Sequence, residues 1–172
     1  FLVALVALAL FPASAQAIIL FGKDNTGNLT DPGTGVEFDA VARVSNNGGA
    51  SPAGTAIHLG FGYMLTANHV SNRSHVSFDG VTYYARDTSF TPVQVASGVD
   101  MKIFRLENVP PVSAVTLLSS AAETTGSATM VGWGRGRDPS VDIDTNVVAW
   151  GDNATINKRW ALNAPRDAVN LS

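Results

Sequence analysis

The sequence contains no cysteine, so neither a disulfide nor a thiolate metal site can contribute to its stability or chemistry. Charged residues are also scarce, at 15%, and the 11 lysines and arginines are scattered along the chain. A formal net charge of −3 without a basic cluster gives no indication of nucleic-acid binding. No His-Glu-x-x-His or similar short spacing indicates zinc. We therefore expect no metal and no cofactor.

Long hydrophobic runs are almost absent, and the one exception is at the start. Residues 1–11 are continuously apolar but too few to span a bilayer, and Pro12 ends the run. Small residues follow at signal-peptidase spacing, so we interpret residues 1–17 as a secretory signal peptide, clipped at its start and cleaved after Ala17. A buried core strand is the alternative for residues 1–11, but no strand pattern accompanies them. We expect a secreted or periplasmic protein without membrane association beyond this targeting.

The remaining composition favours an all-β fold. Apolar residues make up 45%, glycine is abundant at 16, and valine and threonine recur in short runs bounded by turn residues. Glycine-rich turns at 60–62 and at Asp79-Gly80 predict two hairpins. A closed antiparallel barrel would cover the strand edges. The strands that we predict in the first part of the chain are 38–44, 55–59, 63–66, 76–78, 81–85, 93–96 and 101–106.

Three segments, taken in order, carry the functional information. In residues 63–70, Tyr-Met-Leu-Thr-Ala-Asn-His-Val, an apolar strand ends in Thr-Ala and a histidine follows one residue later. Residues 99–106 read Val-Asp-Met-Lys-Ile-Phe-Arg-Leu, and residues 130–134 read Met-Val-Gly-Trp-Gly. They resemble the segments Leu-Thr-Ala-Ala-His, Asp-Ile-Ala-Leu-Leu-Lys-Leu and Gly-Trp-Gly of trypsin-like serine proteases.

The resemblance implies a function and a role for two residues. His69 is expected to be the catalytic base and Asp100 the carboxylate that orients it, whereas Gly132-Trp133-Gly134 is structural. The chain would belong to a secreted serine endopeptidase that cleaves polypeptide substrates through an acyl-enzyme. Val70 stands where animal trypsins carry a cysteine, which indicates a bacterial relative.

The resemblance also implies a trypsin-like double antiparallel β-barrel. We expect residues 18–118 to form a complete first barrel that carries His69 and Asp100. Residues 119–172 would supply a linker and an incomplete second barrel, with strands at 128–133, 146–150 and 159–162.

The nucleophile is not found in this sequence. Serines such as Ser51, Ser127, Ser140 and Ser172 lack the flanks of a Gly-Asp-Ser-Gly-Gly segment and are expected in loops or turns. We expect that segment to follow Ser172, and we expect residues 18–172 alone to be inactive.

Two other functions remain open. A catalytically inactive homologue could keep the barrels and act as a binding or interaction protein. An unrelated secreted β-sandwich could act as an adhesion module, and it predicts that His69 and Asp100 lie far apart. The other histidines are less informative: His58 should face away from Ile57 and Leu59 within its strand, and His75 should be solvated in a loop.

Overall fold

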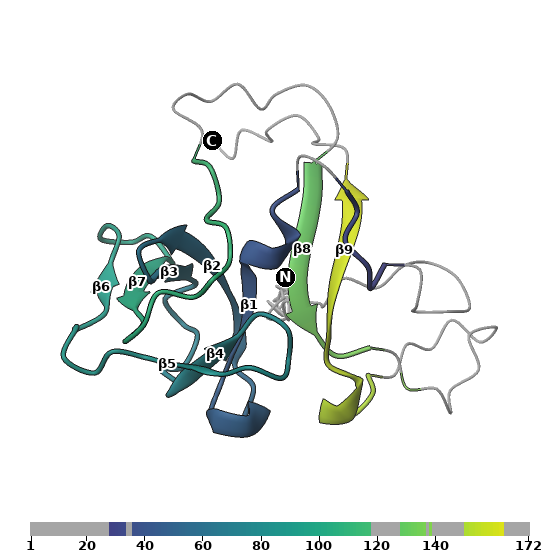
Figure 1. Ribbon diagram of the computed structural model, residues 1–172, viewed down its shortest axis with the longest axis horizontal. Coiled ribbons are helices and arrows are strands. Elements are labelled where there is room, and N and C mark those ends of the chain that lie inside the picture. Colours follow the sequence, from purple (N-terminus) through teal and green to yellow (C-terminus); the bar gives the residue numbers. More distant parts are fainter. Residues whose placement is uncertain (1–27, 34–35, 118–127, 137, 139–149, 164–172) are drawn as a thin grey trace, which may run out of the picture.

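The computed structural model describes residues 28–33, 36–117, 128–136, 138 and 150–163 (Figure 1). Strands dominate this part of the chain, and it contains short 3-10 turns but no α-helix. None of its helices is long and apolar enough to cross a membrane. The elements in chain order are η1 (Phe38–Ala40), β1 (Val41–Ser45), η2 (Asn47–Gly49), β2 (Gly54–Gly60), β3 (Tyr63–Thr66), β4 (His75–Ser77), β5 (Tyr84–Ala85), β6 (Val93–Gln94), β7 (Lys102–Arg105), β8 (Ala128–Gly134), η4 (Asn153–Thr155) and β9 (Asn157–Asn163).

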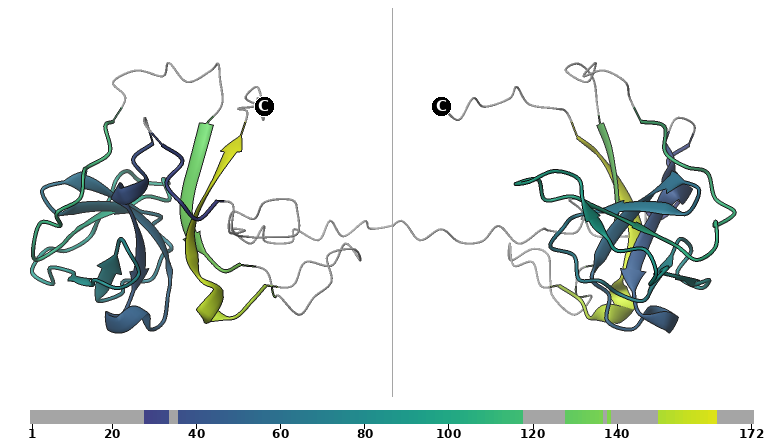
Figure 2. Two further views of the ribbon diagram at one scale, coloured as in Figure 1. Left: turned by 45° about the vertical axis from the view of Figure 1, so that its right-hand side comes forward. Right: turned by 90° about the vertical axis from the view of Figure 1, so that its left-hand side faces the viewer.

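Seven strands form one curled antiparallel sheet, in the order β5-β4-β1-β2-β3-β7-β6 (Figures 1 and 2). The curl brings the end of β5 against β7. The backbone N–H of Asp87 donates to Arg105 O at 2.8 Å, and the N–H of Glu107 donates to Ala85 O at 3.0 Å. Between them, Arg86 and Leu106 form an isolated antiparallel β-bridge. These bonds satisfy backbone groups that an open sheet edge would leave unpaired.

The core lies inside this curl. Inward-facing side chains alternate along β3 and β7, where Met64 and Phe104 are almost fully buried. Strand β1 is buried on both faces, because β8 packs beside it (Figure 1). Apolar burial is the main stabilising contribution to such a sheet. The cluster comprises Ala42, Val44, Ala56, Met64, Val70, Val76, Phe78, Phe104 and Leu106.

Strands β8 and β9 form a separate antiparallel hairpin that stands beside β1 and β2 (Figure 2). Trp133 joins the two sheets: its indole Nε1 donates to Val41 O at 3.0 Å, and its backbone N–H donates to Thr55 Oγ1 at 2.9 Å. On the other side, the N–H of Trp160 donates to Asn28 O at 3.2 Å. The hairpin is therefore held between the curled sheet on one side and residues that precede β1, such as Asn28, on the other.

The all-β prediction is confirmed, and seven strands precede residue 107 in the described part of the chain, but several strand boundaries differ from those predicted, two of them substantially. Residues 38–40 form η1 rather than the start of a strand, because local backbone bonds close a turn there: Ala40 N–H donates to Glu37 O at 3.1 Å, and Val41 N–H donates to Phe38 O. Strands β4 and β5 pair as predicted, yet a six-residue connection, 78–83, replaces the two-residue turn.

The side chain of Asp79 explains that longer connection. Its Oδ1 accepts from the backbone N–H groups of Val81 and Thr82, at 2.8 and 2.7 Å, which holds the chain in a local loop. Burial alone would raise the pKa of Asp79, but these bonds and those from the Thr82 and Ser77 hydroxyls lower the pKa to about 2.

The hairpin between β2 and β3 is confirmed, with Phe61 and Gly62 as its two turn residues at φ values of 51° and 79°. A phenylalanine is unfavourable at positive φ, and Phe61 is 87% exposed, so packing offsets little of that cost. We predict that Phe61→Asn raises the free energy of unfolding by about 1 kcal/mol, because asparagine tolerates this conformation. Thermal denaturation measures the change, and Phe61→Ala, which keeps the unfavourable φ, is the control. A lower melting temperature for Phe61→Asn would contradict this account of the turn.

Several predicted features lie outside the described residues. These are the signal peptide 1–17, most of the linker beginning at residue 119, the predicted strand 146–150 apart from Trp150, and Ser127, Ser140 and Ser172. The predicted strand 159–162 is confirmed within β9, and 128–133 is confirmed within β8.

Candidate active site

The register of two neighbouring strands brings the two predicted site residues together. Strands β3 and β7 pair antiparallel, with Thr66 opposite Lys102, so the chain leaving β3 emerges beside the chain entering β7. His69 comes shortly after β3, in a turn closed by a 3.0 Å bond from Val70 N–H to Ala67 O, and Asp100 comes shortly before β7. Topology therefore places both residues at one end of the sheet.

Asp100 binds both the ring and the backbone of His69. The distance from His69 Nδ1 to Asp100 Oδ2 is 2.5 Å, and the backbone N–H of His69 donates to Asp100 Oδ1 at 3.0 Å. An ionised carboxylate can only accept, so in the neutral imidazole Nδ1 carries the proton and Nε2 keeps its lone pair. The imidazole is thus oriented and offers a base at its far nitrogen.

The pair is open to solvent, because the side chains of His69 and Asp100 are 69% and 58% exposed. The side-chain hydrogen bond from His69, followed by the one from its backbone, lowers the pKa of Asp100 below its ordinary value of 3.8. Within the described residues no hydroxyl hydrogen-bonds His69, and the described Ser51 lies in an exposed loop. This arrangement provides a base and its orienting group, with space for a further group to approach.

This geometry predicts a measurable change in the acidity of Asp100. In His69→Ala the ring bond, the largest cause of the shift, is removed, so the pKa of Asp100 should rise toward 3.8. Carboxyl ¹³C NMR titration measures it. His75→Ala is the matched control, because the His75 ring contacts Ser74 at 2.9 Å instead. An unchanged Asp100 titration in His69→Ala would show that the contact does not form in solution.

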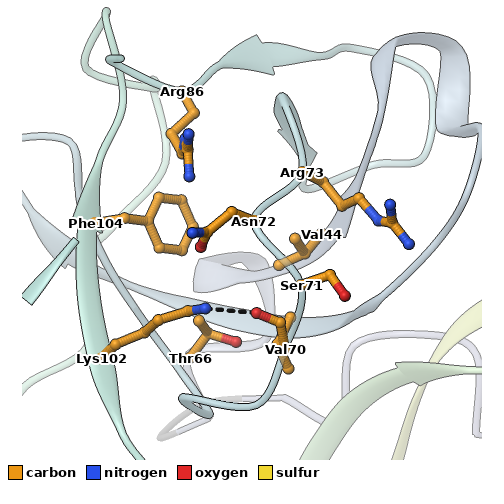
Figure 3. Close-up of a pocket in the computed structure, with 9 residues that line it drawn as sticks. All are labelled: Val44, Thr66, Val70, Ser71, Asn72, Arg73, Arg86, Lys102 and Phe104. Atoms are coloured by element: carbon orange, nitrogen blue, oxygen red, sulfur yellow. Dashed lines mark hydrogen bonds between the residues drawn. The ribbon is translucent and has the colours of Figure 1, made fainter. Parts of the chain in front are cut away.

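The sequence reasoning missed one residue beside this pair. The ammonium of Lys102 donates to Val70 O at 2.5 Å (Figure 3). It also donates to Asn68 O at 3.1 Å, so it binds the carbonyls of the residues on either side of His69. The signal was present in the sequence: along β7, Lys102 alternates with Ile103 and falls on the same face as Phe104.

The other histidines have structural surroundings. His58 is 2% exposed and packs edge-on against Phe78; its Nδ1 lies 3.3 Å from Ser113 O, and its Nε2 accepts from Gly62 N–H at 3.4 Å. It therefore faces the core, opposite to Ile57 and Leu59, as predicted. His75 was expected in a loop, but it is the first residue of β4. Among the described residues, no three His, Cys, Asp or Glu side chains gather in a way that would hold a metal ion.

No model of a known protein family, no curated protein and no solved structure matches this chain. The functional argument therefore depends on the three sequence motifs and on the geometry of His69 and Asp100.

Proposed function

We propose that this chain is the N-terminal part of a secreted trypsin-like serine endopeptidase, in which His69 is the general base and Asp100 orients it. The nucleophilic serine and the oxyanion hole would be supplied by sequence that follows Ser172. The observation that carries the proposal is the His69–Asp100 contact, at 2.5 Å, between two motifs that occur in the order of that family.

The chemistry follows from the protonation of the imidazole. Asp100 holds the proton on Nδ1, so Nε2 takes the proton of the serine hydroxyl as its oxygen attacks the peptide carbonyl. Nε2 then gives that proton to the departing amine, which leaves an acyl-enzyme. Water attacks the acyl group in turn, again with His69 as base, and releases the second product. No cofactor takes part in these steps.

The proposal includes a double antiparallel barrel as the fold. The curled sheet β1–β7 would be the first barrel, and its support is the set of backbone bonds that join the end of β5 to β7. Hairpin β8–β9 would begin the second barrel; it is antiparallel and carries the Gly-Trp-Gly segment in β8. The pair His69–Asp100 would then lie on the rim of the first barrel.

An inactive homologue that binds other proteins is the second candidate, because it would retain the same fold and the same contact. The β-sandwich alternative predicts that His69 and Asp100 are far apart, and their contact argues against it.

Sequence beyond Ser172 separates the two candidates. A protease should encode Gly-Asp-Ser-Gly-Gly, or a close variant, within roughly a few tens of residues, since further barrel strands must come first. A different residue at the serine position would favour the inactive homologue. N-terminal sequencing of the secreted protein tests the signal peptide, with cleavage after Ala17 as the expected result.

A further inference from the structure

Lys102 occupies a core-facing position of β7, where an apolar residue is expected. It lies on the inward face of β7 with Phe104, opposite Thr66 of β3, and only 7% of it is exposed. A lysine is rarely buried to this extent unless its ammonium is paired, because removing that charge from water is costly.

Among the described residues, no ion pair of Lys102 accounts for this burial. The other charged residues that line the pocket around Lys102 are Arg73 and Arg86, and no carboxylate lines it (Figure 3). Burial, followed by the charge of Arg86, lowers the pKa of Lys102, with Asp100 opposing the shift from outside the pocket. A well-packed apolar side chain would fill the site without this cost. Stability alone therefore does not explain a lysine here.

The hydrogen bonds of the ammonium suggest what the lysine does. It donates to Val70 O at 2.5 Å and to Asn68 O at 3.1 Å, and these carbonyls belong to the residues directly after and before His69. From the same end of β7, Asp100 accepts the His69 backbone N–H at 3.0 Å. The residues at the start of β7 thus hold the turn around His69 in two ways. The Asp100 carboxylate accepts the His69 N–H, and the Lys102 ammonium donates to the carbonyls of the two flanking residues.

We propose that Lys102 is a positioning residue, which fixes the backbone on both sides of His69 and so keeps the imidazole directed at Asp100. Its contribution to catalysis rests on the proposed function, whereas its effect on the turn does not. Without the ammonium, both carbonyls lose this donor, and within the described part of the chain the turn keeps its bonds to Asp100 and the Val70–Ala67 bond.

The test compares Lys102→Met, which keeps the length and apolar stem, with Lys102→Arg, which keeps the donors, in the full chain. Arg86→Met is the control, because it removes a charge from the same pocket without touching the carbonyls. Circular dichroism and thermal denaturation first establish that each variant is folded. Two NMR measurements follow: hydrogen exchange of the His69 backbone amide, and the ¹³C titration of the Asp100 carboxyl.

In folded Lys102→Met, exchange of the His69 amide should accelerate about tenfold or more, because the turn opens locally. The pKa of Asp100 should rise toward 3.8 as the bonds from His69 weaken. Arg86→Met should leave the amide exchange unchanged, and Lys102→Arg should restore part of the protection. In a protein that also contains the nucleophile, kcat should fall about 10- to 100-fold with little change in KM, because the base is misplaced rather than removed.

The proposal is overturned if folded Lys102→Met shows wild-type exchange at His69 and a wild-type Asp100 titration. Acceleration in Arg86→Met as large as in Lys102→Met would also overturn it, since the effect would then come from charge rather than from the carbonyl bonds. If Lys102→Met does not fold, Lys102→Leu, which also lacks a donor, carries the same measurements and the same outcomes. Neither NMR readout requires proteolysis, so failure of the proposed function would leave the result on the turn intact.

Discussion

Replacement of His69 by alanine is expected to lower kcat/KM for a peptide substrate by about 10⁴- to 10⁶-fold in the protein that contains the nucleophile. The serine would lose the base that takes its proton, and the residual rate would come from substrate binding and the oxyanion hole alone. Steady-state kinetics with a chromogenic peptide measures the loss.

His75→Ala is the control for this variant, because His75 is at the start of β4 and its ring contacts Ser74. It should retain wild-type kinetics. His69→Ala with more than a tenth of the wild-type kcat/KM would place the base elsewhere in the protein.

Asp100→Asn is expected to lower kcat by about 10⁴-fold with little change in KM. The amide can donate to Nδ1, which would move the ring proton to Nε2 and leave no lone pair for the serine hydroxyl. The His69 backbone N–H can still bind the amide oxygen, so the turn should keep its conformation. Single-turnover kinetics measures the chemical step directly.

Glu107→Gln is the matched control, since Glu107 is an exposed carboxylate beyond the end of β7. It should leave kcat unchanged. The pH dependence of the contact follows from the same bonds. Because the bonds from His69 lower the pKa of Asp100, the orienting contact is present above that pKa and is lost as pH falls through it. Equal kcat for Asp100→Asn and wild type would remove Asp100 from the mechanism.

The strands of the curled sheet could be predicted because their local signals agree with their final surroundings. The stretch 63–66 alternates, buries Met64 and Thr66, and follows a tight glycine turn, so local pattern and tertiary packing lead to the same strand. The site residues could be predicted for a related reason. Each motif fixes the position of its residue relative to the end of a strand, and the β3–β7 pairing brings the two strand ends together.

Other features depend on contacts that no local pattern contains. The connection after β4 is six residues long because the Asp79 carboxylate binds the N–H groups of Val81 and Thr82, whereas Asp-Gly by itself predicts a two-residue turn. Residues 38–40 alternate like a strand, yet they fold into η1, and the carbonyl of Phe38 accepts from Lys158 Nζ of β9 at 3.1 Å. The role of Lys102 depends on where the turn at 68–70 lies in space, which its own strand pattern does not specify.

The central claim is that His69 activates a serine, and covalent labelling tests it most directly. The protein extending beyond Ser172 would be treated with a fluorophosphonate, which modifies only an activated serine, and the adduct mapped by mass spectrometry. The account predicts one labelled serine, within a Gly-Asp-Ser-Gly-Gly segment, and loss of labelling in His69→Ala. An absence of labelling in the folded protein, or a labelled serine that His69→Ala leaves equally reactive, would contradict it.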